Sequence, residues 1–155
     1  FLNLFKNMKN LDYITGDLIS PWADIKMDVH NIPFDENLFD VLICNHVLEH
    51  VDDDKKVMSE LFRVMKPGGW GIFQVPINKN SKYTLEDKNI TDPKKREELY
   101  WQSDHVRLYG LDYGDKLRSV GFIVTESNFI NEIDMSLVER YALPKDEIIY
   151  FCEKK

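Results

Sequence analysis

The sequence lacks several features that mark specialised classes of protein. Its 155 residues include only two cysteines, Cys44 and Cys152. Both lie in apolar runs, so we expect buried thiols and not a disulfide or a metal pair. No apolar run approaches the roughly 18 residues that span a bilayer, and no segment resembles a signal peptide. We therefore expect a protein of the reducing cytoplasm with no membrane partner.

An excess of positive charge is also missing. The net charge is −7, and the basic cluster Lys94-Lys95-Arg96 is followed at once by Glu97 and Glu98. An acidic chain without a Lys/Arg stripe repels a phosphate backbone, so we expect no nucleic-acid partner. About 43% of the residues are hydrophobic, which is enough for a core. Residues 1–155 are therefore expected to form a single domain.

The order of apolar segments predicts an α/β fold. Expected strands cover residues 11–16, 23–27, 39–44, 70–77, 122–125 and 148–152, and expected helices cover 2–8, 53–65, 111–120 and 134–141. The run 39–44 is nearly all apolar, which favours a strand buried on both faces of a sheet. We therefore predict a mostly parallel, Rossmann-like sheet in a three-layer sandwich, with an antiparallel edge strand near the end of the chain.

Two acidic residues follow two successive predicted strands. Asp17 ends the first, and Asp28, followed by Val29, ends the second. In open α/β sheets, ligands bind beyond the carboxyl ends of the strands, where a carboxylate accepts hydrogen bonds from a ribose diol. An acid with an apolar neighbour also suits the amine and the face of an adenine ring. For each acid alone, capping of a turn remains the alternative.

A longer pattern carries a family resemblance. Residues 38–51 read LFDVLICNHVLEHV, and residues 61–69 read LFRVMKPGG. With the loop after Asp28, they resemble the small-molecule, type 11 branch of class I S-adenosylmethionine-dependent methyltransferases, over residues 11–122. The resemblance implies S-adenosylmethionine as cofactor and a small-molecule methyl acceptor. It would assign Asp17 to the ribose, Asp28 and Val29 to adenine, and Asn45 and His46 to the methionine end and the substrate.

One departure from that family concerns its first strand and glycine-rich loop, which hold the amino-acid part of the cofactor. Gly16 is the only glycine before Gly68, and about ten residues precede the strand that ends at Asp17. We therefore expect the first strand to be missing, so that an upstream segment supplies it or the chain is a remnant. The fragment alone is then expected to bind cofactor poorly. A non-catalytic, partner-binding module remains an alternative.

A second motif competes with this interpretation. His46-Val47-Leu48-Glu49-His50 matches H-x-x-E-H, in which two histidines on one helix face bind zinc and the glutamate acts as base. His46 instead follows a predicted strand, and the next helix begins after a new cap at Asp52 or Asp53. We therefore expect no metal here, and a zinc hydrolase is the less favoured alternative. For His50, we expect a packed imidazole bonded to backbone.

Residues 78–109 form a long polar and aromatic insertion expected to cover the pocket. Within it, Asp92-Pro93 predicts the start of a helix, with Asp92 as cap and Pro93 at the first helical position. His105 could act as a general base alongside His46, and Arg107 could bind an anionic group of the substrate. Tyr83 and Trp101 could line an aromatic acceptor site. The alternative is that these side chains brace or pack the insertion.

Overall fold

The computed structural model describes residues 2–155, with side chains from residue 4 onward, so Phe1 and the side chains of residues 2 and 3 in the expected opening helix lie outside the described part. The helices are α1 (Leu2–Lys6), α2 (Asp54–Val64), α3 (Pro93–Tyr100), α4 (Tyr113–Ser119), the 3₁₀ helix η1 (Phe129–Glu132) and α5 (Met135–Arg140). The strands are β1 (Gly16–Asp17), β2 (Ile25–Lys26), β3 (Phe39–Asn45), β4 (Met65–Gln74), β5 (Leu85–Glu86), β6 (Arg107–Leu108), β7 (Ile123–Ser127) and β8 (Ile149–Glu153).

The main sheet has the order β3-β4-β8-β7 and mixes two directions. β3 and β4 are parallel, whereas β8 runs antiparallel to both β4 and β7. The sequence prediction of an α/β fold with an antiparallel edge is confirmed. β1 and β2 form a separate parallel pair, in which Asp17 is opposite Lys26. Within residues 2–155, β3 pairs with β4 alone, so its other edge lies open.

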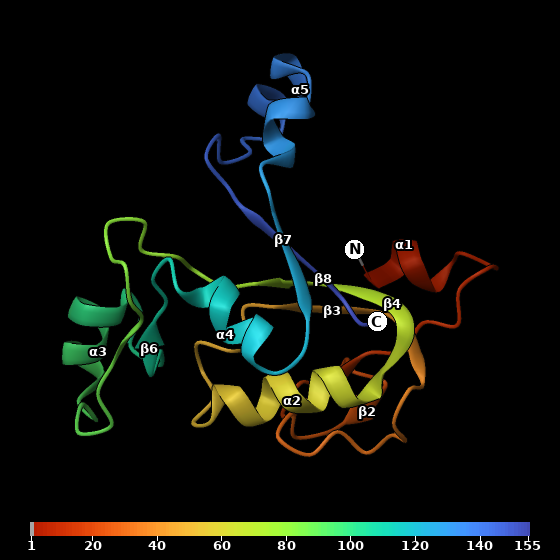
Figure 1. Ribbon diagram of the computed structural model, residues 1–155, viewed down its shortest axis with the longest axis horizontal. Helices are drawn as coiled ribbons and strands as arrows, with labels where there is room; N and C mark the ends of the chain where they lie inside the picture. The colour runs from red at the N-terminus through yellow and green to blue at the C-terminus, as the bar shows by residue number, and fades with distance from the viewer. Residues whose placement is uncertain (1) are drawn as a thin grey trace.

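Helix α2 begins and ends where the sequence predicts. The Asp53 carboxylate accepts a hydrogen bond from the Lys56 N–H at 2.9 Å, as an N-cap residue does. After Val64 the chain continues directly into β4, and Gly68 turns with a φ of +80°. Figure 1 shows α2 (yellow) running beneath the strands of the main sheet. Helix α2 thereby covers one face of the main sheet.

The core lies between the sheet and the helices α2 and α4. The ring of Phe62 on α2 meets Phe122 at a centroid distance of 5.1 Å, and Phe122 meets Phe73 of β4 at 5.2 Å. Tyr113 of α4 packs on Tyr150 of β8 at 4.6 Å. Burial raises the pKa of both cysteine thiols, Cys44 and Cys152, to about 12. Both thiols are free, as predicted.

The expectation that the strand over residues 39–44 is buried on both faces was wrong. Val41 and Ile43 of β3 are 42% and 50% exposed, and Trp70 of β4 is 37% exposed. These side chains alternate with the buried Cys44 and Phe73, so one face is covered and the other is open over the described residues. The apolar run in β3 therefore does not signal burial on both faces. Alternation is hidden because the open face is also apolar.

The insertion 78–109 forms a lobe of its own, with α3 and the antiparallel pair β5–β6. Asp92 caps α3 through the Lys94 N–H at 2.9 Å, with Pro93 in the first turn, as predicted. This lobe lies to one side of the sheet, and η1 and α5 project beyond the ends of β7 and β8 (Figure 1). None of the described helices has the length and apolar character required to cross a membrane.

Candidate active site

Asp17 is the last residue of β1, Asp28 lies two residues after the end of β2, and each closes a turn. Oδ1 of Asp17 accepts hydrogen bonds from the N–H groups of Ser20 at 2.7 Å and Ile19 at 2.8 Å, which lower the pKa of this carboxyl. Oδ1 of Asp28 accepts from the His30 N–H at 2.9 Å and lies 2.7 Å from His30 Nδ1. These contacts lower the pKa of Asp28. Both carboxyls are therefore ionised near neutral pH.

The hydrogen bonds within the turns leave acceptor sites on both carboxylates. The bonds to the turn go to Oδ1, and an ionised carboxylate offers about four lone-pair sites on its two oxygens. Because β1 and β2 are parallel neighbours, the two acids lie toward the same end of this two-stranded pair. The capping alternative is present in the structure, and it leaves capacity for a ligand.

The loop after Asp28 is attached to helix α2. Arg63 donates to the carbonyls of Ile32 at 2.9 Å and Phe34 at 2.7 Å, and to the Glu60 carboxylate at 2.7 Å. Glu60 also accepts from the Ile32 N–H at 3.0 Å. Val29 in this loop is half-buried against the core. The segment after Asp28, which the family resemblance assigns to adenine, is thus attached to α2 through Ile32 and Phe34.

Asn45 and His46 lie where β3 ends. Oδ1 of Asn45 accepts from the Gln74 N–H at 3.3 Å, and the His46 N–H donates to the Gln74 carbonyl at 2.8 Å, which extends the β3–β4 pairing by one residue. His46 has a φ of +57°, in the left-handed region, and its side chain is 66% exposed. This conformation projects the imidazole from the rim of the sheet.

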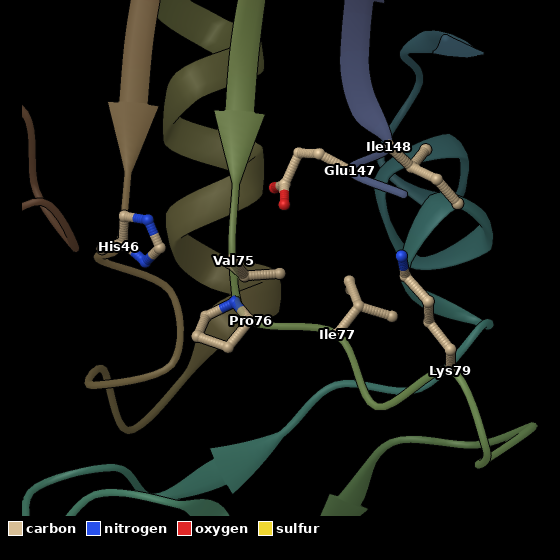
Figure 2. Close-up of a pocket in the computed structure, with 7 residues that line it drawn as sticks. All are labelled: His46, Val75, Pro76, Ile77, Lys79, Glu147 and Ile148. Carbon is tan, nitrogen blue, oxygen red and sulfur yellow. The ribbon is translucent and has the colours of Figure 1, made fainter. Parts of the chain in front are cut away.

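A cavity of about 150 Å³ opens beside His46 (Figure 2). Its remaining walls come from the end of β4 and the approach to β8: Val75, Pro76, Ile77, Lys79, Glu147 and Ile148. Figure 2 shows His46 and Pro76 at the ends of two neighbouring strands, with the Glu147 side chain across the opening. The volume lies below the roughly 300–1,000 Å³ typical of ligand pockets, so it fits part of a small substrate.

Lys79 and Glu147 were not anticipated from the sequence. Lys79 Nζ lies 2.7 Å from the Asp146 carboxylate, and Glu147 accepts from the Gln74 side-chain amide at 3.0 Å. An antiparallel last strand must begin at the edge where the parallel strands end. The predicted antiparallel edge was therefore the signal that residues just before β8 belong to this rim.

Arg107 lies inside the protein and is 0% exposed. Its guanidinium donates to the carbonyl of Leu48 at 2.6 Å and to the carboxylate of Glu86 at 2.9 Å, and Asp54 lies 3.8 Å from Nε. Burial by itself would lower the pKa of Arg107, but Glu86 and Asp54 raise it. This arrangement favours the bracing alternative over contact with a substrate.

His105 and the two aromatic candidates also lie away from the cavity walls. His105 is 4% exposed, and its Nδ1 lies 2.8 Å from the Tyr100 carbonyl. Tyr83 and Trp101 are 64% and 55% exposed on the insertion. The structure therefore brings His46 to the cavity and leaves His105, Tyr83 and Trp101 outside its lining.

Comparison with known proteins finds a similarity to methyltransferases in the first half of the chain. Residues 7–73 match the model of a methyltransferase domain family. A ubiquinone biosynthesis O-methyltransferase of Thiobacillus denitrificans is 36% identical over 84 residues. That match covers 54% of this chain and 32% of the relative, so the chain spans about a third of the relative's length.

Solved structures show the fold. The chain superposes on the 1,6-didemethyltoxoflavin-N1-methyltransferase of Burkholderia thailandensis with a TM-score of 0.58 and 13% identity, over 90% of this chain and 60% of that one. It also superposes on the cyclase SpnF with a TM-score of 0.55 and 15% identity, over 84% and 56% of the two chains. The fold is Rossmann-like, and a fold of this kind does not fix one reaction.

Proposed function

We propose that the protein is a class I S-adenosylmethionine-dependent methyltransferase of the type 11 branch and transfers a methyl group from S-adenosylmethionine to a small molecule. The match of residues 7–73 to a methyltransferase domain family and the similarity to methyltransferases support this proposal. The acceptor would present a nucleophilic oxygen, nitrogen or carbon. Two free, buried thiols suit the reducing cytoplasm in which we place this activity.

The observation that carries the proposal is that Asp17 ends β1 opposite Lys26 of its parallel neighbour β2, with Asp28 two residues beyond Lys26. Two ionised carboxylates toward the same end of this pair match the two donor groups of an adenosine: the ribose diol and the adenine amine. Val29 follows Asp28 and supplies an apolar contact for the ring. Asn45 and His46 end the next strand and border the cavity, where the methionine end and the acceptor would meet.

The chemistry is a displacement at the sulfonium methyl. A bond forms between the acceptor atom and the methyl carbon while the carbon–sulfur bond breaks, and its electron pair neutralises the sulfur. An acceptor that carries a proton would pass it to His46, whose imidazole is 66% exposed and borders the cavity. The protein's main contribution is the in-line alignment of the acceptor atom, the methyl carbon and the sulfur.

The insertion 78–109 would set the choice of acceptor. Segments that cover a pocket on a rigid scaffold often carry specificity. Val75, Pro76, Ile77 and Ile148 give the cavity an apolar wall that suits a hydrocarbon or aromatic acceptor. Tyr83 and Trp101 are exposed and could cover such an acceptor only after the insertion moves toward the rim.

The test is titration calorimetry of the full protein with S-adenosylmethionine and S-adenosylhomocysteine. Asp17→Asn keeps an oxygen for the turn N–H groups but removes the charge. A charged hydrogen bond contributes roughly 1.5–3 kcal/mol, so we expect the Kd to rise about 10- to 100-fold. Asp12→Asn, an exposed acid a few residues away, is the matched control and should leave the Kd unchanged.

An unchanged Kd for Asp17→Asn would remove Asp17 from the cofactor site. Absence of binding both by residues 1–155 and by a version extended upstream would overturn the methyltransferase proposal and favour a non-catalytic binding module.

A further inference from the structure

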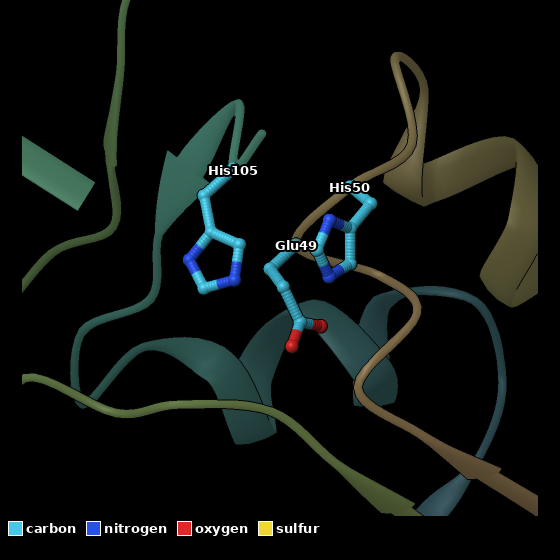
Figure 3. Close-up of side chains that lie close together, drawn as sticks. All are labelled: Glu49, His50 and His105. Atoms are coloured by element: carbon cyan, nitrogen blue, oxygen red, sulfur yellow. The ribbon is translucent and has the colours of Figure 1, made fainter. Parts of the chain in front are cut away.

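We propose that Glu49, His50 and His105 form a binding site for a divalent transition-metal ion of the zinc class. One ligand atom from each of the three side chains lies within 4.8 Å of the other two. Figure 3 shows the two imidazoles and the Glu49 carboxylate gathered at one place, with His105 on the insertion and the other two on the turn after β3. The imidazole rings meet edge to face, with a centroid distance of 4.7 Å.

The Glu49 carboxylate supplies an independent reason to expect a ligand. This residue is 1% exposed, and its Oε2 has no hydrogen-bond partner. Oε1 is used, because it lies 3.2 Å from His46 Nδ1. A buried polar atom without a partner is rare and costs stability. A cation among Glu49, His50 and His105 would satisfy Oε2.

Both imidazoles have one nitrogen occupied and the other left for a metal. His105 Nδ1 lies 2.8 Å from the Tyr100 carbonyl, which only accepts, so Nδ1 carries the proton and Nε2 keeps a lone pair. His50 Nδ1 lies 3.2 Å from the Asp104 carboxylate. Metal-binding histidines usually hold their second nitrogen against a carbonyl or a carboxylate in this way. The expectation that the His50 ring bonds to backbone was wrong.

The donor set selects the class of ion. Two imidazole nitrogens with one carboxylate suit zinc and its neighbours in the first transition row, whereas magnesium and calcium prefer oxygen ligands. Three ligands at about 2.0–2.2 Å from one ion lie roughly 3.3–3.7 Å apart in tetrahedral or trigonal geometry, so ligand atoms separated by up to 4.8 Å must approach by about 1 Å. His50 is 31% exposed at its side chain, and its rotation can close the gap.

This site differs from the H-x-x-E-H interpretation of the sequence. Residues 46–50 form turns and not a helix, so His46 and His50 do not share a helix face. His105 takes the place of His46 because the Val106 N–H donates to the Glu49 carbonyl at 2.9 Å and holds the insertion against the turn. An ion here would fix the insertion to the body of the domain. The inference does not depend on methyl transfer.

The experiment is a titration of the metal-free full protein with Zn²⁺ against a chromophoric chelator, repeated with Mg²⁺. We expect one Zn²⁺ per chain and no comparable binding of Mg²⁺. His50→Gln should weaken binding by more than about 100-fold, and Asp104→Asn, which acts on His50, by about 10- to 100-fold. His30→Gln, a histidine outside the cluster, is the matched control and should bind Zn²⁺ as the wild type does.

His105 is buried, so His105→Gln is interpreted only if its circular dichroism matches that of the wild type, and the partly exposed His50 carries the test in any case. His46→Gln should retain Zn²⁺, because His46 lies outside the cluster. The inference is overturned by failure to bind stoichiometric Zn²⁺, by equal affinity in wild type and His50→Gln, or by a preference for Mg²⁺. Each readout is made without S-adenosylmethionine, so its result is separate from that of the cofactor titration.

Discussion

His46 Nδ1 lies 3.2 Å from Oε1 of Glu49, so an imidazole that is 66% exposed is held by a carboxylate that is 1% exposed. A carboxylate accepts hydrogen bonds, and it favours the tautomer with the proton on Nδ1. The lone pair of Nε2 is then free for the cavity side. A buried acid thus orients the residue that we propose as the proton acceptor.

The first prediction concerns this imidazole. His46→Asn removes the base but keeps a residue that tolerates the left-handed φ of +57°. For an acceptor that must lose a proton, we expect kcat to fall about 100-fold or more. The Kd for S-adenosylhomocysteine should change less than about threefold, since charge on the cofactor rim is untouched. An unchanged kcat would exclude His46 as the base.

The second prediction concerns the buried cation. Arg107→Met fills similar space but removes the donor to the Glu86 carboxylate and to the Val51 carbonyl, and it removes the cation beside Asp54. Removal of one member of a buried ion pair costs about 3–5 kcal/mol. We expect a loss of this size in the free energy of unfolding by urea.

Arg96→Met is the control for Arg107→Met. Its guanidinium bonds to the Ile90 carbonyl at 2.9 Å from a half-buried position, so a loss of about 1 kcal/mol is expected. Equal losses in the two variants would show that Arg107 does not brace the insertion.

The third prediction is a pH dependence. The Arg63 guanidinium, together with the Ile32 N–H and Lys56, lowers the pKa of Glu60 to about 2 from 4.5. A depressed folded-state pKa means that the stabilisation is complete above about pH 4.5 and is lost as the pH falls toward 2. The pH-dependent stabilisation from Glu60 is at most about 3 kcal/mol.

Glu60→Gln should therefore lower stability at pH 7 and flatten the urea midpoint between pH 5 and 2. Glu132→Gln, an exposed acid, should follow the wild-type curve. A Glu60→Gln curve that runs parallel to the wild type across this window would contradict the assignment.

The fourth prediction compares two glycines with positive φ. A Cβ at Gly121, where φ is +114°, would lie 2.8 Å from the Phe62 ring, whereas a Cβ at Gly68, where φ is +80°, meets nothing within 4 Å. Gly68→Ala should cost about 1–2 kcal/mol from the backbone alone. Gly121→Ala should cost at least 1 kcal/mol more, because the Phe62–Phe122 contact must shift as well. Equal decreases in melting temperature for Gly68→Ala and Gly121→Ala would show that the Phe62 ring moves without a cost in free energy.

The sequence predicted most helices and strands because their signals are local. Asp53 and Asp92 cap helices that begin where expected, and the end of α2 before Lys66-Pro67-Gly68 follows from backbone chemistry. Two close strands at the end of the chain correctly predicted an antiparallel edge. Short elements were less accurate: β1 spans Gly16–Asp17 alone, although residues 11–16 read as a strand.

Contacts between side chains that lie far apart in the sequence could not be predicted from the sequence. His105 and Arg107 resemble pocket residues, yet packing of the insertion turns both toward the interior. The same packing brings His105 to Glu49 and His50, more than fifty residues away in the sequence. An apolar run, likewise, does not reveal whether a second layer covers it, which is why the exposure of Val41 and Ile43 was missed.

The sequence by itself determined the α/β class, the caps and breaks of the main helices, and the acids at or just after the ends of β1 and β2, since these depend on local propensity and on the direction of neighbouring strands. Only the tertiary structure decided which histidine faces the cavity, which one joins Glu49, and that Arg107 is internal. The physical reason is that burial and long-range hydrogen bonds choose among side chains whose local sequence signals are equivalent.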